Sequence, residues 1–399
     1  MITITDKAQC CGCWACSNIC PKQCITMEED DEGFRYPKVN KFTCIECGLC
    51  EKVCPIKKTQ QDDSLPKSYV VQHKNASILK VSTSGGFFTA ISKYVISKNG
   101  VVFGAAFNEK MELTHQYSET LDGCSKFRGS KYVQSLIGNS YTKAKEFLQE
   151  GRLVVFSGTP CQIAGLHEYL RNKSYPNLIT VDLVCRGTPS PKLLRKYLSY
   201  YAKTARSKVI DYRSRNKYYG YYYSTASIWF ADKNKKYHKG KESDIMLQLY
   251  FKNICSRPSC YNCHFKTIHR VSDFTIFDCW DAPSINKKFS TEGATNVFIH
   301  TKKGEDIFEL LKEDFIWSKS DIKSIIQKDG IMIKGLVPKN PNRNSFFKDL
   351  DTLPIEIVKK KYIHTSFIKK TLTYIKPICF RLGIFQNYLK IKKILISPK

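Results

Sequence analysis

The arrangement of cysteines near the N-terminus restricts what this chain can fold into more than any other feature. Ten of the 18 cysteines of the 399-residue chain lie between Cys10 and Cys54. They repeat one pattern, Cys10-x2-Cys13-x2-Cys16-x3-Cys20-Pro21 and Cys44-x2-Cys47-x2-Cys50-x3-Cys54-Pro55. The first residues lack the basic and apolar segments of a secretory leader, so we expect a cytoplasmic chain. In that compartment, clustered thiols indicate metal or redox chemistry and not disulfides.

The spacing of both runs is that of bacterial ferredoxins, in which three close thiolates bind one 4Fe-4S cluster and the fourth crosses to the other cluster. The tight x2-x2 loop aims three thiolates at one cube, and the x3-Cys-Pro step turns the chain towards its neighbour. We therefore predict two 4Fe-4S clusters. One is assigned to Cys10, Cys13, Cys16 and Cys54, and the other to Cys44, Cys47, Cys50 and Cys20. A pair of zinc knuckles is the alternative, but zinc sites usually take two close pairs of ligands.

Beyond a polar linker at 59–68, helical and strand patterns alternate. Helices are predicted from Phe87 to Val95 and at 141–150, 162–172 and 191–203, and buried strands at 101–107, 153–156 and 178–184. A short hairpin with a glycine turn is predicted at 25–37. The predicted fold is an α+β ferredoxin-like two-cluster head, an α/β body with a mainly parallel or mixed sheet, and a basic helical C-terminal tail. The expected divisions are the head at 1–58, the linker at 59–68, the body at 69–150 and 151–320, and the tail at 321–399.

Four cysteines of the body predict a further metal site. Cys161 and Cys185 each follow a predicted strand, and such positions share one edge of a parallel sheet. Cys260 and Cys263 form a Cys-x2-Cys pair that needs two more ligands. We therefore predict a third 4Fe-4S cluster on Cys161, Cys185, Cys260 and Cys263. The alternatives are Cys255 in place of one of the first two, zinc at this site, or cysteines that only pack in the core. The remaining cysteines are interpreted as structural: Cys11, Cys24, Cys124, Cys279 and Cys379.

Two polar segments are candidates for binding an anion. The turn Ser82-Thr83-Ser84-Gly85-Gly86 precedes a predicted helix, whose first N–H groups suit a phosphate. Ordinary N-capping explains these residues equally well. The segment Phe127-Arg128-Gly129-Ser130-Lys131-Tyr132 adds two cations beside a Gly-Ser step, and a basic surface loop is its alternative.

With these motifs the chain resembles the beta subunit of coenzyme F-420 hydrogenase/dehydrogenase and its bacterial relatives, from about Cys10 to about Gly304. Besides the cysteine runs, the resemblance is carried by 84–90, 127–133, 156–166, 182–191 and 257–263. It implies a ferredoxin module, an α/β body that holds FAD, and an additional iron–sulfur cluster. It also implies flavin contacts by Ser84, Gly85, Gly86, Arg128, Ser130, Lys131, Gly158, Thr159 and Pro160. Two departures are Arg186, where the family commonly has His, and Phe277-Asp278-Cys279-Trp280-Asp281, which lacks both glycines of the family loop.

A flavin together with iron–sulfur clusters suggests an oxidoreductase that connects a two-electron donor or acceptor with one-electron carriers. The expected path joins a hydride carrier or organic substrate, FAD, the body cluster and the two head clusters, in either direction. The alternative is a non-catalytic, ferredoxin-type electron-transfer subunit of a larger complex, linked to surface-polysaccharide biosynthesis. No Ser/His/Asp or paired-carboxylate constellation is recognised, so no catalytic residue is assigned.

The net charge of +28 is unevenly distributed. Residues 1–60 are neutral overall, whereas 355–399 carry eleven Lys/Arg against one acid. We expect phosphate-bearing cofactors and an acidic redox partner, and no nucleic acid, because no recognition motif accompanies the charge. The tail suits contact with an anionic membrane at the inner face, in short helices limited by Pro377 and Gly383. A helical cap with lysines in water is the alternative, and no apolar run is long enough to span a bilayer.

Overall fold

The computed structural model describes residues 1–399 apart from 59–64, 224, 365–366 and 397–399. These residues divide into two compact units, which are described separately. Unit 1 contains Met1–Lys192 and Ser256–Lys339, and unit 2 contains Leu193–Cys255 and Asn340–Lys399. This division differs from the expected boundaries at 150 and 320, because the last 60 residues form one unit with an internal segment. Residues 59–64 of the expected linker lie outside the described residues, and Lys67 already belongs to a strand.

The head of unit 1 consists of two short helices and an antiparallel hairpin. The predicted hairpin is confirmed, with Ile25 opposite Val39 and Glu29 opposite Arg35. Its turn contains Gly33 at φ +86°, and a Cβ at this position would lie 2.4 Å from Cβ of Lys192. Glycine is therefore required both by the backbone conformation and by the close approach of another segment. The elements of the head are α1 (Ala15–Ile19), β1 (Ile25–Glu29), β2 (Arg35–Val39) and α2 (Leu49–Lys52).

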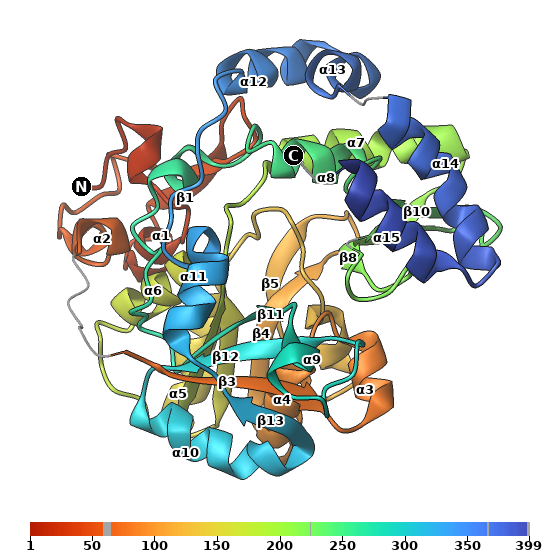
Figure 1. Ribbon diagram of the computed structural model, residues 1–399. Coiled ribbons are helices and arrows are strands. Elements are labelled where there is room, and N and C mark those ends of the chain that lie inside the picture. Colours follow the sequence, from red (N-terminus) through yellow and green to blue (C-terminus); the bar gives the residue numbers. More distant parts are fainter. Residues whose placement is uncertain (59–64, 224, 365–366, 397–399) are drawn as a thin grey trace. The chain divides into compact units, whose positions relative to one another are not determined.

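The body of unit 1 is built on one eight-stranded mixed sheet with the order β13-β3-β12-β11-β7-β6-β4-β5 (Figure 1). The central strands β4, β6, β7 and β11 are parallel to their neighbours in that series, and the remaining pairs are antiparallel. The strands are β3 (Lys67–His73), β4 (Val101–Phe107), β5 (Leu113–Ser118), β6 (Val154–Gly158), β7 (Leu178–Leu183), β11 (Phe274–Cys279), β12 (Ala294–Ile299) and β13 (Phe315–Lys319). The α/β body is thus confirmed, with a mixed sheet.

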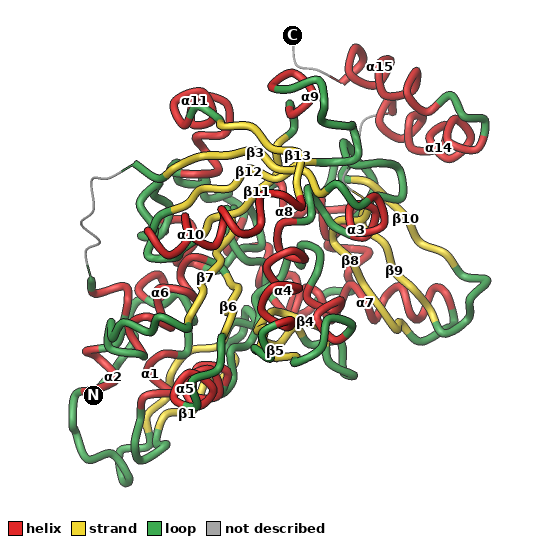
Figure 2. Tube along the Cα trace, turned by 90° about the horizontal axis from the view of Figure 1, so that it is seen from below, coloured by secondary structure: helices red, strands yellow, loops and turns green. Residues whose placement is uncertain are grey.

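Helices cover both faces of this sheet. Along β4, Val101 and Phe103 pack with α5 and α6, whereas Val102 and Ala106 pack on the opposite face with α4 and α10. A strand buried on both faces gives a continuous apolar run, which explains why this segment was recognisable in the sequence. The head lies against the α5–α6 face, where α1 is beside α6 (Figure 2). The helices are α3 (Ala76–Val81), α4 (Phe87–Ser97), α5 (Ser140–Gln149), α6 (Pro160–Tyr169), α9 (Ala282–Ile285), α10 (Lys302–Leu311) and α11 (Ile322–Ile333).

Unit 2 combines a three-stranded antiparallel sheet with helices. The sheet has the order β10-β9-β8, and Tyr219 and Tyr223 near its strands pack against Leu372, Phe385 and Tyr388 of the tail. The helix at 367–381 continues through Pro377, so the expectation that this proline would limit it is wrong. A single missing N–H is tolerated because the same helix side buries Leu372 and Lys376. The elements are α7 (Pro191–Ala205), β8 (Val209–Asn216), β9 (Thr225–Phe230), β10 (Lys236–Gly240), α8 (Ile245–Phe251), α12 (Arg343–Thr352), α13 (Ile355–Tyr362), α14 (Phe367–Arg381) and α15 (Phe385–Ile396).

Candidate functional site

The two cysteine runs of the head fold in the same way. Gly12 and Trp14 adopt left-handed backbone conformations, at φ 68° and 66°. Glu46 and Gly48, which lie 34 positions later, do the same at φ 52° and 71°. The helices α1 and α2 then begin at equivalent residues, Ala15 and Leu49. The repeated spacing therefore produces a repeated loop that turns the first three cysteines of each run inward.

The first head cavity has a volume of about 340 Å³ and is lined mostly by apolar side chains. It brings together Cys10, Cys13 and Cys16 of the first run with Cys54 of the second. This is the complete ligand set predicted for one cluster, with the fourth residue crossing from the other run. Cys11 also lies in its wall.

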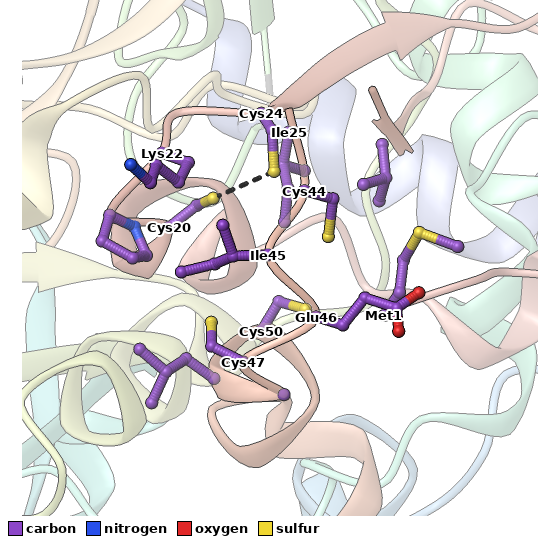
Figure 3. A pocket seen from close by; sticks show the side chains of 14 residues that line it. Met1, Cys20, Lys22, Cys24, Ile25, Cys44, Ile45, Glu46, Cys47 and Cys50 are labelled. Atoms are coloured by element: carbon purple, nitrogen blue, oxygen red, sulfur yellow. Dashed lines mark hydrogen bonds between the residues drawn. The ribbon is translucent and has the colours of Figure 1, made fainter. Parts of the chain in front are cut away.

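The second head cavity has a volume of about 360 Å³ and is shown in Figure 3. Its wall contains Cys44, Cys47 and Cys50 of the second run and Cys20 of the first, as predicted for the other cluster. Cys24 is a fifth cysteine in this wall, and its Sγ lies 3.3 Å from Sγ of Cys20. Cys47 is exposed, so this cavity opens to the surface of the head.

The third cavity lies in the body and has a volume of about 530 Å³. It is lined by all four predicted cysteines, Cys161, Cys185, Cys260 and Cys263. Cys161 and Cys185 follow the neighbouring parallel strands β6 and β7, so their common sheet edge is confirmed. Cys260 lies in η4 (Pro258–Asn262), and the backbone N–H of Thr188 donates to its Sγ at 3.4 Å.

All three cavities offer four thiols in an apolar wall, which is the donor set of a 4Fe-4S cluster. Among the residues that the structure describes, no three or more His, Cys, Asp and Glu are grouped so as to hold a single metal ion. Cys255, the alternative ligand, is fully buried and is not part of the wall of the third cavity. The donor chemistry thus fits clusters held by the four cysteines of each set.

The candidate flavin contacts form a continuous series of neighbours in unit 1. Ser84 donates its hydroxyl to Asp278, and the N–H of Gly85 donates to Oγ1 of Thr295 at 2.8 Å. A Cβ on Gly129 would lie 3.7 Å from Oγ1 of Thr83, so the turn at 82–86 approaches the loop that carries Arg128, Ser130 and Lys131. The Nζ of Lys131 donates to the carbonyl oxygens of residues 126, 127 and 128, each at 2.9 Å.

The loop Gly158-Thr159-Pro160 connects these segments with the third cavity. Thr159 caps α6 in a capping box with Gln162, and its Oγ1 lies 3.2 Å from Sγ of Cys161. Pro160 lines the third cavity. One loop therefore carries candidate flavin contacts on one side and a candidate cluster ligand on the other.

Comparison with known proteins decides the family. Residues 151–324 match the model of the C-terminal part of the coenzyme F420 hydrogenase/dehydrogenase beta subunit, and residues 9–58 match the 4Fe-4S dicluster domain. The chain belongs to the family of F420 hydrogenase/dehydrogenase beta subunits. Its head is a 4Fe-4S cluster-binding domain.

Three relatives illustrate the extent of the similarity. The F component of the F(420)H(2) dehydrogenase of Methanosarcina mazei is 21% identical over 76% of this chain and 83% of its own length. The coenzyme F420-dependent sulfite reductase of Methanocaldococcus jannaschii is 25% identical over 76% of this chain and 46% of its own. The I 2 component of the NADH-quinone oxidoreductase of Geobacter metallireducens is 40% identical over 13% of this chain and 43% of its own. The chain therefore spans less than half of two of these relatives.

Within this member of the F420 hydrogenase/dehydrogenase family, Cys11 links two of the cavities. It lines both the first head cavity and the third cavity, and it bonds with Cys13 on one side and Cys161 on the other. The bond with Cys11, together with the hydroxyl of Thr159, lowers the pKa of Cys161 to about 7. The cysteine that the sequence left without a role therefore lies in the wall between two predicted cluster sites.

Burial raises the pKa of most other candidate ligands in this F420 hydrogenase/dehydrogenase family member. It raises the pKa of Cys54 to about 11 and that of Cys263 to about 12, and it also raises the pKa of Cys185 and Cys260. These thiols stay protonated at neutral pH, so binding a metal at these sites must release protons.

Two buried arginines that sequence patterns did not identify face the candidate sites. Arg270 lines the third cavity beside Asp182, and its Nη1 has no hydrogen-bond partner within the described residues. Arg257 reaches Cys10 of the head. Both lie near cysteine motifs, but nothing in the sequence distinguishes them from the other 62 basic residues. No helix in the described part of the chain is long and apolar enough to cross a bilayer.

Proposed function

We propose that this chain is an iron–sulfur flavoprotein subunit that transfers electrons between a two-electron donor or acceptor and three 4Fe-4S clusters, with FAD between them. The observation that carries the proposal is the sorting of the cysteines. Each of three cavities contains one complete, non-overlapping set of four predicted ligands. Twelve cysteines from five separate segments would not be sorted in this way if they only filled the core.

When bound, clusters carry single electrons and a flavin exchanges pairs of electrons. The residues of this chain hold the thiolates in place and exclude water. Apolar side chains such as Ile2, Trp14 and Ile56 surround the first head cavity, and Phe265 and Ile56 border the third. Arg186, Lys266 and Arg270 in the third wall supply positive charge opposite the thiolates. This charge offsets the cost of burying the anionic sulfurs.

The flavin would contact the turn at 84–86, the loop at 128–131 and the loop at 158–160. Support comes from their continuity, because Gly129 approaches Thr83 and Thr159 adjoins Cys161. Gly85 has a packing role as well, since a Cβ there would lie 2.2 Å from the carbonyl oxygen of Val71. The names of the two longer relatives favour coenzyme F420 as the hydride carrier. A protein partner that accepts or supplies single electrons is favoured because the first of them is named as part of a larger dehydrogenase.

Cofactor content tests the proposal and separates it from a ferredoxin-type subunit without flavin. Anaerobically reconstituted chain should contain about 12 iron atoms and one flavin, since each 4Fe-4S cluster takes four cysteines. About 8 iron atoms and no flavin would overturn the body cluster and the FAD together. The double variant Cys260→Ser/Cys263→Ser should lose about four iron atoms. Cys255→Ala is its matched control, and loss of iron there would revive the alternative ligand.

A second property is favoured by one observation in unit 2, namely contact with an anionic membrane surface. The hairpin of α14 and α15 carries large apolar side chains on its exposed side, whereas two of its lysines face inward. Lys376 and Lys392 pair with the buried carboxylate of Glu242 at 3.8 and 3.3 Å. An exposed apolar face in a segment with eleven Lys/Arg suits lipids with negative headgroups.

A further inference from the structure

The guanidinium group of Arg257 is almost completely buried in unit 1, with 1% of the residue exposed. Its Nε donates to the carbonyl oxygen of Cys10 at 2.7 Å, and its Nη2 reaches Sγ of the same cysteine at 3.4 Å. Nη1 donates to Oε1 of Gln134 at 2.9 Å, and Nη2 also donates to the carbonyl oxygen of Arg35 at 3.0 Å. No carboxylate is among these partners, so the positive charge is directed at the thiol of Cys10.

The packing around this group leaves little freedom. The ring of Tyr36 lies 4.2 Å from the guanidinium carbon, measured to the ring centroid. A Cβ on Gly12 would lie 2.9 Å from Nη1 of Arg257 and 2.6 Å from Nε2 of Gln134. Gln134 also donates to the carbonyl oxygen of Cys11 at 3.0 Å. The loop Cys10–Gly12 is thus held by two buried side chains of the body, and the glycine is needed for their approach.

The backbone of Arg257 belongs to the third cavity. Its N–H donates to the carbonyl oxygen of Thr188, and its own carbonyl accepts from the N–H of Cys260, both at 3.0 Å. Thr188 in turn donates its N–H to Sγ of Cys260. One residue therefore contacts a candidate ligand of the head with its side chain and a candidate ligand of the body with its backbone.

We propose that Arg257 is a positioning residue that fixes the head site at Cys10 against the body site and raises the reduction potential of the cluster bound by Cys10, Cys13, Cys16 and Cys54. The inference rests on the proposed function, because it requires that cluster to be present. Reduction adds negative charge, and a buried cation at a ligand sulfur stabilises the reduced form more than the oxidised form. Hydrogen bonds to cluster sulfurs act in the same direction.

The test is an EPR-monitored redox titration of the anaerobically reconstituted full chain, with iron counted in each sample. Arg257→Met removes the charge, and Gln134→Glu keeps an acceptor for Nη1 while offsetting the charge. Both should make one head cluster harder to reduce and leave the other unchanged. For Arg257→Met we expect about a tenfold change in the reduction equilibrium, or about 59 mV for one electron. Arg257→Lys retains the charge and should stay close to the wild-type midpoint.

Lys52→Met is the matched control, because it removes an exposed positive charge from the head that water already screens. Unchanged midpoints in Arg257→Met and Gln134→Glu, at full iron content, would overturn the inference. If Arg257→Met loses its iron, Gln134→Glu decides alone. A wild-type chain without iron would instead refute the proposed function, so the two failures are distinguishable.

Discussion

The Sγ atoms of Cys20 and Cys24 lie 3.3 Å apart in the wall of the second head cavity. Only Cys20 has the spacing of a cluster ligand, since it precedes Pro21 at the end of the first run. Burial raises the pKa of Cys20, but hydrogen bonds from Cys24 and from nearby backbone N–H groups outweigh this and lower it overall. The pKa of Cys24 is raised to about 12, first because of its bond to Cys20. The pair therefore behaves as a thiolate held by a neutral thiol.

From this relationship we predict different outcomes for the two cysteines. Cys24→Ala should keep the full iron content, whereas Cys20→Ala should lose up to one cluster, about four iron atoms. The neighbouring Cys24 can replace the missing ligand, so the double variant should lose more iron than Cys20→Ala. Iron analysis and EPR of the reduced samples provide the measurement. Equal iron content in Cys20→Ala, the double variant and the wild-type chain would contradict the ligand assignment.

A second prediction concerns Cys161, whose pKa is lowered to about 7 by its bond with Cys11. In the metal-free chain, Cys161 should react with iodoacetamide at pH 7 faster than Cys263, whose pKa burial raises to about 12. Cys11→Ala should slow alkylation of Cys161 by about tenfold, because the stabilising hydrogen bond is lost. Mass spectrometry of the labelled peptides measures the rates, and Cys124→Ala serves as the control. An unchanged rate in Cys11→Ala would show that Cys11 does not stabilise the thiolate.

A third prediction concerns acid stability. His115 is buried, its ring stacks on Phe156 with centroids 5.5 Å apart, and its Nε2 lies 3.1 Å from the carbonyl oxygen of Ser157. Burial lowers the pKa of His115 to about 4. The unfolded chain therefore binds the extra proton first, and folding stability should fall as the pH falls from about 6.5 to 4, by about 3 kcal/mol in total.

His115→Phe should flatten this part of the stability profile, since no group at that position then titrates. At pH 7 the variant should lose about 1 kcal/mol, because the hydrogen bond to Ser157 is gone. Urea unfolding at several pH values measures both effects. The same replacement at the exposed His364 is the control and should leave the acid profile unchanged. A profile for His115→Phe that parallels the wild type would assign the acid sensitivity to other groups.

The sequence was most informative where structure depends on local spacing. The head pattern predicted both cavities because its ligands come from two nearly identical loops, with left-handed residues at corresponding positions such as Gly12 and Glu46. Strands β4, β6 and β7 were also recognised, since they are buried on both faces and read as apolar runs. The third cavity followed from one rule, that neighbouring parallel strands end at one edge.

What the sequence could not provide depends on contacts between distant segments. Strand β3 pairs with β12, whose residues follow more than 200 positions later, and nothing local in Lys67–His73 indicates that partner. The antiparallel half of the sheet was therefore missed. Arg257 and Cys11 gained their roles in the same way, because their significance comes from Cys10 and Cys161, which only the fold brings near. Pro377 shows the opposite case, a local helix breaker overruled by packing.

The last prediction concerns the apolar face of unit 2. Phe367 and Ile394 are 82% and 79% exposed on α14 and α15. Intact chain should sediment with vesicles that contain phosphatidylserine and not with pure phosphatidylcholine, and binding should weaken as salt increases. Phe367→Ser/Ile394→Ser should reduce binding at least tenfold, since each side chain contributes on the order of 1–2 kcal/mol when buried in lipid. These substitutions are preferable to removing residues 353–399, which would uncover Tyr219 and Tyr223. Leu310→Ser removes a 66% exposed leucine from α10 and is the matched control. Full binding by the double variant, or none by the intact chain, would end the membrane proposal and leave this face to a protein partner.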